Sequence, residues 1–226
     1  MGKLVVIESG TDSSGKETQS RLLFAGLQKE YERVKKVEFP NYNSRSSALI
    51  KMYLQGEFGD RPEDVNCFAA STFYAVDRYA SYLREWKRLY DQGWIIIADR
   101  YTTSNMVHQG GKLSSREERI DYLAWLEDLE FKKFGLPAPD CVVLLDVPLD
   151  KSRELLRERG NKKGREERDI HEEDFEHLKD SYDNALWLAD RYDWVRIDCI
   201  RKGELRSVDD IQGEIYRRVS DRLNLD

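Results

Sequence analysis

Short apolar runs alternate along the chain with longer segments in which apolar residues recur every three or four positions. The apolar runs predict five β-strands, at 4–7, 34–39, 94–98, 142–145 and 194–197. Three of these runs are continuously apolar, as in parallel strands that are covered on both faces. Helices are expected at roughly 16–32, 45–55, 64–92, 116–134, 150–159, 172–191 and 207–222. This order predicts an α/β fold, a doubly wound five-stranded parallel sheet flanked by helices.

The composition narrows the class of protein further. The 226 residues contain no repeat and no low-complexity linker, so we expect one domain over 1–226. A net charge of −6 argues against general nucleic-acid binding, and no apolar run is long enough for a membrane span. Three widely separated cysteines fit a reduced compartment, and the first apolar run leaves no room for a signal peptide. We therefore expect a cytoplasmic protein.

A phosphate-binding loop is indicated directly after the first predicted strand. The sequence reads G-x-x-x-x-G-K from Gly10 to Lys16, and a helical pattern follows. Glycines let backbone N–H groups converge on phosphate oxygens, and the helix N-terminus adds positive potential. Lys16 would reach the outer phosphates of ATP. The expected ATP-binding residues are Gly10, Thr11, Asp12, Ser13, Ser14, Gly15, Lys16, Glu17 and Thr18.

Glu17 stands where this loop normally has Ser or Thr, whose hydroxyl contacts Mg²⁺. A carboxylate there would repel the triphosphate, but it can also point away and rest against the positive helix N-terminus. Asp99 ends the third predicted strand, at the edge where such sheets bind ligands. We predict that Asp99 orients a magnesium ion held by ATP oxygens and waters, so that the loop remains active.

Three further segments carry a resemblance to a known family. Residues 99–110, "DRYTTSNMVHQG", are similar to the pattern D-R-Y-x-x-S-x-x-A-Y-Q-G of thymidylate kinases. The loop is similar to their G-x-D-x-x-G-K-x-T-Q, while "FYAVDR" at 73–78 and "GLPAPDCVVLLDVP" at 135–148 resemble two more segments. The chain thus resembles this family of P-loop nucleoside monophosphate kinases along nearly its whole length.

The resemblance implies an ATP-dependent kinase of a pyrimidine deoxynucleoside monophosphate, above all one that converts dTMP to dTDP. It implies a P-loop NTPase fold with a mobile lid, Mg²⁺ as cofactor, and ATP and the monophosphate as partners. A homodimer is an open alternative to a monomer. Two other functions also stay open: a kinase of another nucleotide or nucleoside, and a nucleotide-binding homologue without catalytic activity.

Residue roles follow from the resemblance by position. Tyr74 would stack on the pyrimidine, with Phe73 as the alternative. Arg78, on the same helix face one turn later, would donate to a base carbonyl, and Asn105 would pair with the base edge. Asp12 would contact the sugar 3′-hydroxyl near the phosphate acceptor. The other expected substrate-binding residues are Phe39, Arg45, Arg100, Ser104, His108 and Gln109.

The segment "RERGNKKGREERD" at 157–169 is the expected lid, although its composition alone also fits a solvated loop. Phosphoryl transfer needs cations on the transferring group, and the phosphate loop between its glycines has no basic residue. The lid would then supply the cation. Arg157, Arg159, Arg165 and Arg168 are candidates, and we favour Arg165 and Arg168 as catalytic residues beside Lys16, Asp12 and Arg100.

Three departures from the family pattern bear on the substrate. Ser9 stands where the family commonly has Glu, and Glu8 lies one place earlier. His108 replaces a tyrosine associated with crowding the ribose 2′ position, which leaves deoxy-selectivity open. Tyr42 stands where related kinases have a phosphate-binding arginine; Arg45 either takes over this role or is a surface residue.

Overall fold

The computed structural model describes residues 1–11, 14–155 and 175–225. The predicted five-stranded parallel sheet is confirmed, in the order β2-β3-β1-β4-β5. Its strands are β1 (Lys3–Glu8), β2 (Val34–Glu38), β3 (Ile95–Asp99), β4 (Cys141–Asp146) and β5 (Val195–Asp198). The chain leaves β1 to one side for β2 and β3, then crosses to the other side for β4 and β5. This reversal opens a crevice at the carboxyl ends of the strands near β1.

The helices lie close to their expected positions. They are α1 (Lys16–Leu27), α2 (Ala48–Leu54), α3 (Cys67–Ser81), α4 (Lys87–Asp91), α5 (Thr102–Ser104), α6 (Arg116–Glu127), α9 (Phe175–Arg191) and α10 (Val208–Leu223). Short 3₁₀ turns occupy Arg45–Ser47 and Pro62–Asp64, and π-helical segments occupy Tyr82–Trp86, Asn105–Gln109 and Asp128–Lys133. The sequence did not predict the helical stretch that begins at α5, nor the hairpin of β6 (Ile200–Arg201) and β7 (Glu204–Leu205).

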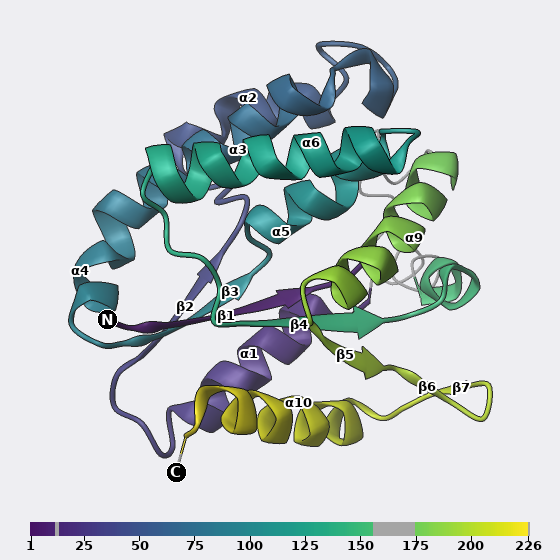
Figure 1. The fold of residues 1–226 in the computed structure, drawn as a ribbon. Helices are drawn as coiled ribbons and strands as arrows, with labels where there is room; N and C mark the ends of the chain where they lie inside the picture. Colours follow the sequence, from purple (N-terminus) through teal and green to yellow (C-terminus); the bar gives the residue numbers. More distant parts are fainter. Residues whose placement is uncertain (12–13, 156–174, 226) are drawn as a thin grey trace.

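Two helical layers cover the sheet. Figure 1 shows α1 and α10 against one face and α3, α6 and α9 on the other side. Side chains alternate along a strand, so Val5 and Ile7 enter one buried cluster with α1 and α10, while Leu4 and Val6 enter the cluster on the opposite face. Burial on both faces is the reason that these strands read as unbroken apolar runs.

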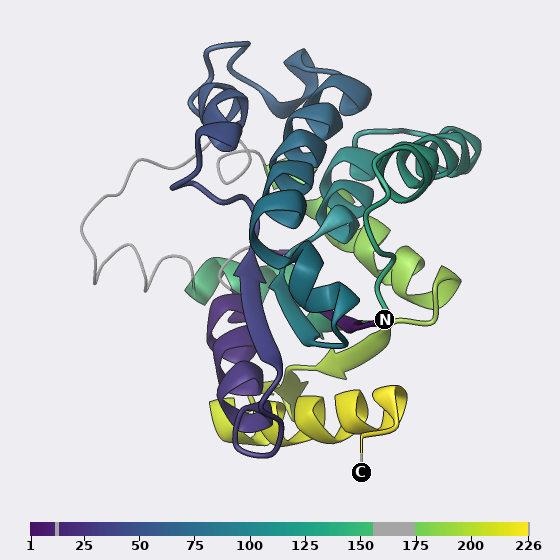
Figure 2. The same ribbon diagram turned by 90° about the vertical axis from the view of Figure 1, so that its left-hand side faces the viewer.

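The segment after β2 is fastened to α3. Asp77 of α3 is buried, and its carboxylate accepts hydrogen bonds from the Asn41 backbone N–H (2.8 Å) and the Ser46 hydroxyl (2.5 Å). Figure 2 shows β2 at the edge of the sheet, rising toward the region of α2 and α3. The anchor holds the chain that follows β2 over the carboxyl edge of the sheet.

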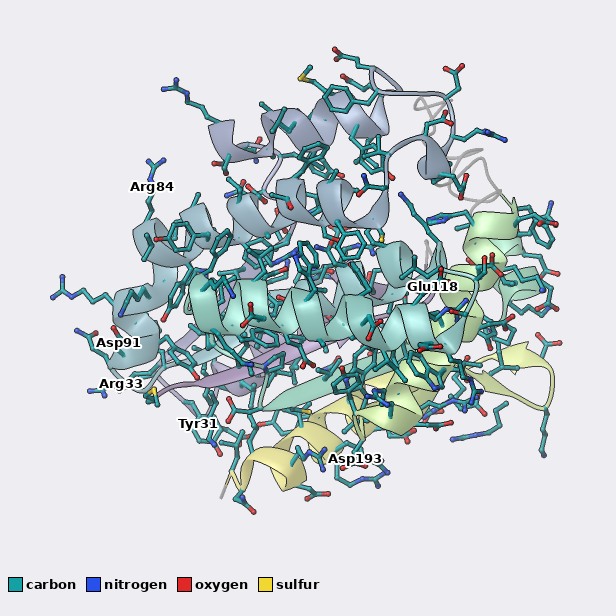
Figure 3. The ribbon with its side chains drawn as sticks, turned by 45° about the horizontal axis from the view of Figure 1, so that its top comes forward. Tyr31, Arg33, Arg84, Asp91, Glu118 and Asp193 are labelled. Atoms are coloured by element: carbon teal, nitrogen blue, oxygen red, sulfur yellow. The ribbon has the colours of Figure 1, made fainter. Side chains whose placement is uncertain are left out.

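Two arginines away from the carboxyl edge of the sheet are exposed. Arg33, directly before β2, and Arg84, on the π-helical segment after α3, are exposed (Figure 3), and Arg33 donates from Nη1 to the Gln92 carbonyl (3.3 Å). Within the described part of the chain, no helix is both long and apolar enough to cross a membrane.

Candidate active site

The phosphate loop has the strand–loop–helix geometry that the sequence predicts. Gly10 follows β1, and a Cβ there would lie 2.8 Å from the Cα of Tyr182 and 2.9 Å from the Cβ of Ala185, both on α9. Only glycine lets the loop pass so close to that helix. Gly15, with φ of 89°, takes the left-handed conformation that begins α1. Asp12 and Ser13 lie outside the described residues.

Lys16 is folded back over the loop. Its ammonium donates to the Ser9 hydroxyl (2.6 Å), the Thr11 carbonyl (3.0 Å) and the Ser14 hydroxyl (3.3 Å). Ser9, in the place of the family's glutamate, therefore contacts this ammonium with a neutral oxygen. The charge of Lys16 is positioned within the loop, where phosphate oxygens would approach the α1 N-terminus.

Asp99 lies beside this loop because Ile7 of β1 pairs with Asp99 of β3 in the parallel register. The Ser20 hydroxyl on α1 donates to its Oδ2 (3.0 Å). Glu17 is exposed in the first turn of α1, a position that leaves its carboxylate away from the loop interior. The sequence analysis did not assign Ser20. The sequence does place Ser20 three residues after Glu17 in the same predicted helix, and therefore on the same helix face.

A pocket that is partly open to solvent lies at the carboxyl edge between α3, α5 and the segment after β2. Eight of the nine expected substrate-binding residues line it: Phe39, Tyr74, Arg78, Arg100, Ser104, Asn105, His108 and Gln109. Pro40, Tyr42, Leu54 and Tyr101 complete the lining. The sequence motifs thus converge on one cavity.

Arg45 is the exception: it is not among the lining residues, and its role in the substrate site stays a prediction. The Ser44 side chain caps the 3₁₀ turn that starts at Arg45, and this turn leaves the arginine exposed and outside the pocket lining. Tyr42 lies in the lining instead. The structure also separates the two candidate stackers, since Phe73 packs against Tyr53 (ring centroids 6.5 Å apart) whereas Tyr74 faces the pocket.

Arg100 is held at the rim of the pocket through both its backbone and its side chain. Its backbone has a φ of 64°, and its N–H donates to the Ile7 carbonyl (3.1 Å). Its Nη1 lies 3.1 Å from Nε2 of His108 and 3.9 Å from Oε1 of Glu8. Because arginine can only donate, Nε2 of His108 is the acceptor. This contact fixes the imidazole between Arg100 and the cavity.

Glu8 is a functional candidate that the sequence analysis did not assign. It is fully buried, and its Oε2 accepts from the hydroxyls of Thr103 (2.9 Å) and Ser104 (2.6 Å). A buried carboxylate needs such partners. In the sequence, Glu8 could have been noticed as a charged residue at the end of an apolar run, directly before the phosphate loop. Glu8 ties the start of α5 to the end of β1.

One side of the pocket is built on α3 and on the π-helical segment after α5. Arg78 is only 1% exposed and lies one turn after Tyr74. Asn105 donates from Nδ2 to the Ser71 carbonyl (3.1 Å), which fixes its amide in the lining. Gln109 is buried, and its Oε1 has no hydrogen-bond partner among the described residues. The pocket therefore combines one aromatic face with several oriented polar groups.

A parallel sheet of this order, with a glycine-rich phosphate loop after β1 and a pocket beside it, defines a P-loop nucleotide kinase. A sequence model described as "Thymidylate kinase" matches residues 7–209. The chain belongs to the thymidylate kinase family. The predicted fold and the phosphotransferase class are thereby confirmed.

Individual relatives agree with this assignment. Thymidylate kinase of Mycobacterium tuberculosis (strain H37Rv) is 32% identical over 176 residues, which cover 76% of this chain and 79% of that protein. The Plasmodium falciparum enzyme is 28% identical over 222 residues, covering 97% and 90%. A solved thymidylate kinase structure from Candida albicans has a TM-score of 0.72 and 20% identity, covering 99% of this chain and 93% of that one. This last likeness shows the fold.

We expect the Glu17→Thr variant to change kcat by less than roughly tenfold, about 1.4 kcal/mol of barrier. The reason is that the Glu17 side chain is exposed, so its charge lies away from the site of the triphosphate. The measurement is turnover against magnesium concentration for the parent and the variant, with Glu32→Thr as a control for removing an exposed carboxylate. A parent that is inert at every magnesium level beside an active threonine variant would contradict this expectation.

Proposed function

We propose that this chain transfers the γ-phosphoryl group of ATP to dTMP and releases dTDP and ADP. The observation that carries the proposal is the convergence of two sites at one sheet edge. The phosphate loop with Lys16 and the pocket with Arg100 follow β1 and β3, which are hydrogen-bonded neighbours. A donor on the loop and an acceptor in the pocket would meet there without a covalent enzyme intermediate.

The pocket suits a pyrimidine monophosphate for chemical reasons. The Tyr74 ring offers a stacking face, and Arg78 offers only hydrogen-bond donors, which match a base carbonyl. Asn105 carries both a donor and an acceptor for the base edge. Arg100, at the rim toward the loop, would bind the phosphate group. Phe39, Ser104, His108 and Gln109 complete the proposed substrate contacts.

Catalysis would depend on positioning and charge. The second pKa of a phosphate monoester is about 6, so the acceptor oxygen is largely ionised at pH 7 and needs no strong base. Lys16 would hold the outer phosphates of ATP, and the proposed lid cations Arg165 and Arg168 would act on the transferring group. These two arginines, like the rest of the expected lid at 157–169, lie outside the described residues, as does the proposed sugar ligand Asp12.

The donor set near the loop fits magnesium. No group of three or more His, Cys, Asp or Glu side chains arranged for a metal occurs among the described residues. Mg²⁺ is commonly held by one or two carboxylates together with phosphate oxygens and waters. Asp99, with its Oδ2 bonded to Ser20, is the carboxylate in that position. Bound magnesium would neutralise charge on the phosphate oxygens.

We expect Lys16→Met to reduce the rate of ADP formation with dTMP by at least about a hundredfold, because the ammonium is removed while the apolar stem remains. A coupled ADP-release assay measures the loss, and the melting temperature of the variant controls for folding. Arg100→Ala should instead raise KM for dTMP while KM for ATP stays within about threefold. Turnover by Lys16→Met equal to that of an active parent would contradict the role of Lys16, whereas a parent without turnover would favour the catalytically silent alternative.

His108 offers a test of sugar selectivity. We expect His108→Tyr to prefer dUMP over UMP more strongly than the parent does, since a tyrosine ring would occupy more space beside the 2′-carbon. The readout is the ratio of kcat/KM for dUMP and UMP. His108→Phe is the matched control, because it adds a six-membered ring without the hydroxyl. Identical ratios in all three proteins would remove His108 from the selectivity of the site.

We also infer that the chain forms a homodimer through α3. Four apolar side chains lie on one side of α3 and of the π-helical segment after it, and each is between 37% and 50% exposed: Phe68, Val76, Tyr79 and Leu83. Ile120 of the neighbouring helix α6 is exposed as well. Exposed apolar side chains that gather on one side of a helix favour association.

A cytoplasmic location of the protein stays a prediction from the sequence.

We expect the parent to have the mass of a dimer in light scattering and Val76→Glu to shift it toward the monomer, because a charge would enter the apolar contact. Leu205→Glu on β7 is the matched control, since Leu205 is similarly exposed at 45% but lies on the hairpin. A parent that is monomeric at every concentration tested would refute the dimer.

A further inference from the structure

A buried ion pair lies at the side of the pocket that α3 and the π-helical segment after α5 build. Glu130, in the π-helical segment after α6, is fully buried, and Arg78 is 1% exposed. Arg78 donates from Nε to Oε2 (2.7 Å) and from Nη2 to Oε1 (2.6 Å), so the two side chains form a bidentate pair. This geometry fixes the plane of the guanidinium, which a single contact would not do.

Two more contacts complete the arrangement. The Thr102 hydroxyl on α5 donates to Oε2 of Glu130 (2.7 Å), and Nη1 of Arg78 donates to the Tyr101 carbonyl (3.4 Å). Three of the five N–H groups that an arginine carries are thus used within the described residues, which leaves one on each terminal nitrogen. Arg78 also lines the pocket. The remaining donors are therefore confined to directions that Glu130 sets.

We propose that Glu130 is a positioning residue for base selection, which holds Arg78 so that its remaining N–H groups donate to a pyrimidine carbonyl. This role rests on the proposed function of the same site. The carboxylate also neutralises the guanidinium, so Arg78 acts as a directional donor and not as a general anion site. Its charge then does not compete with Arg100 for the phosphate group of the substrate.

The arrangement selects among pyrimidines by hydrogen-bond polarity. Thymine and uracil carry a carbonyl oxygen at C4, whereas cytosine carries an amino group there. A fixed arginine donor stabilises the first and meets another donor in the second, which leaves buried polar groups unpaired. A guanidinium without its carboxylate partner could turn away and would lose this discrimination.

The experiment compares Glu130→Gln with the parent in both binding and turnover. We expect KM and the calorimetric Kd for dTMP to rise about tenfold, kcat to change less than about threefold, and the preference for dTMP over dCMP to fall about tenfold. Asp128→Asn is the matched control, because Asp128 is an exposed carboxylate in the same segment that contacts Lys132. We expect this control to match the parent.

Two further variants keep the proposal testable where Glu130→Gln does not fold, since removing one member of a buried pair destabilises a protein. Glu130→Asp retains the carboxylate and should retain part of the dTMP preference. Thr102→Val removes only the hydroxyl contact and should weaken the preference with kcat unchanged. A purely structural Glu130 would lower the melting temperature in these variants without moving the ratio of dTMP to dCMP.

The outcomes separate the two proposals. A folded parent that neither binds nor phosphorylates dTMP refutes the proposed function. A parent that does both, with Glu130 variants whose dTMP-to-dCMP ratio equals that of Asp128→Asn, refutes the positioning role alone.

Discussion

The parallel pairing of β1 with β3 is the constraint on which the rest of the site depends. In this register Ile7 lies opposite Asp99, so the residues that follow both strands emerge side by side. The phosphate loop leaves β1, while Arg100 leaves β3 and donates its backbone N–H to Ile7. Groups that are distant in the sequence are thereby brought to one edge.

Buried carboxylates then orient the groups that this edge collects. Glu8 holds the start of α5 through Thr103 and Ser104, and Glu130 holds Arg78. An ionised carboxylate is costly to bury unless it is paired or hydrogen-bonded. For that reason each of the two carboxylates has few alternative conformations. The side chains that are hydrogen-bonded to it are restricted in the same way.

The sequence predicts those parts of the fold and the site that depend on residues close together in the chain. Strands, the loop and the helix that carries Tyr74 and Arg78 could be predicted from apolar periodicity and from motifs, because both depend on neighbouring residues. Glu130 could not, since its partner Arg78 lies 52 positions away and no local pattern joins the two. Arg45 lies near Tyr42 in the chain, but no local pattern shows whether its side chain reaches the pocket. In the structure, the turn that it starts leaves it exposed.

Helix α3 has two opposite sides with different chemistry. Tyr74 and Arg78 line the pocket, whereas Phe68, Val76 and Tyr79 lie on the exposed apolar side. A helix moves as a stiff rod, so a displacement on one side is also a displacement on the other. If a second copy of the chain covers the exposed side, a nucleotide that shifts α3 changes the association constant, and by thermodynamic reciprocity association changes nucleotide affinity by the same factor. Substrate occupancy and assembly would then be linked equilibria.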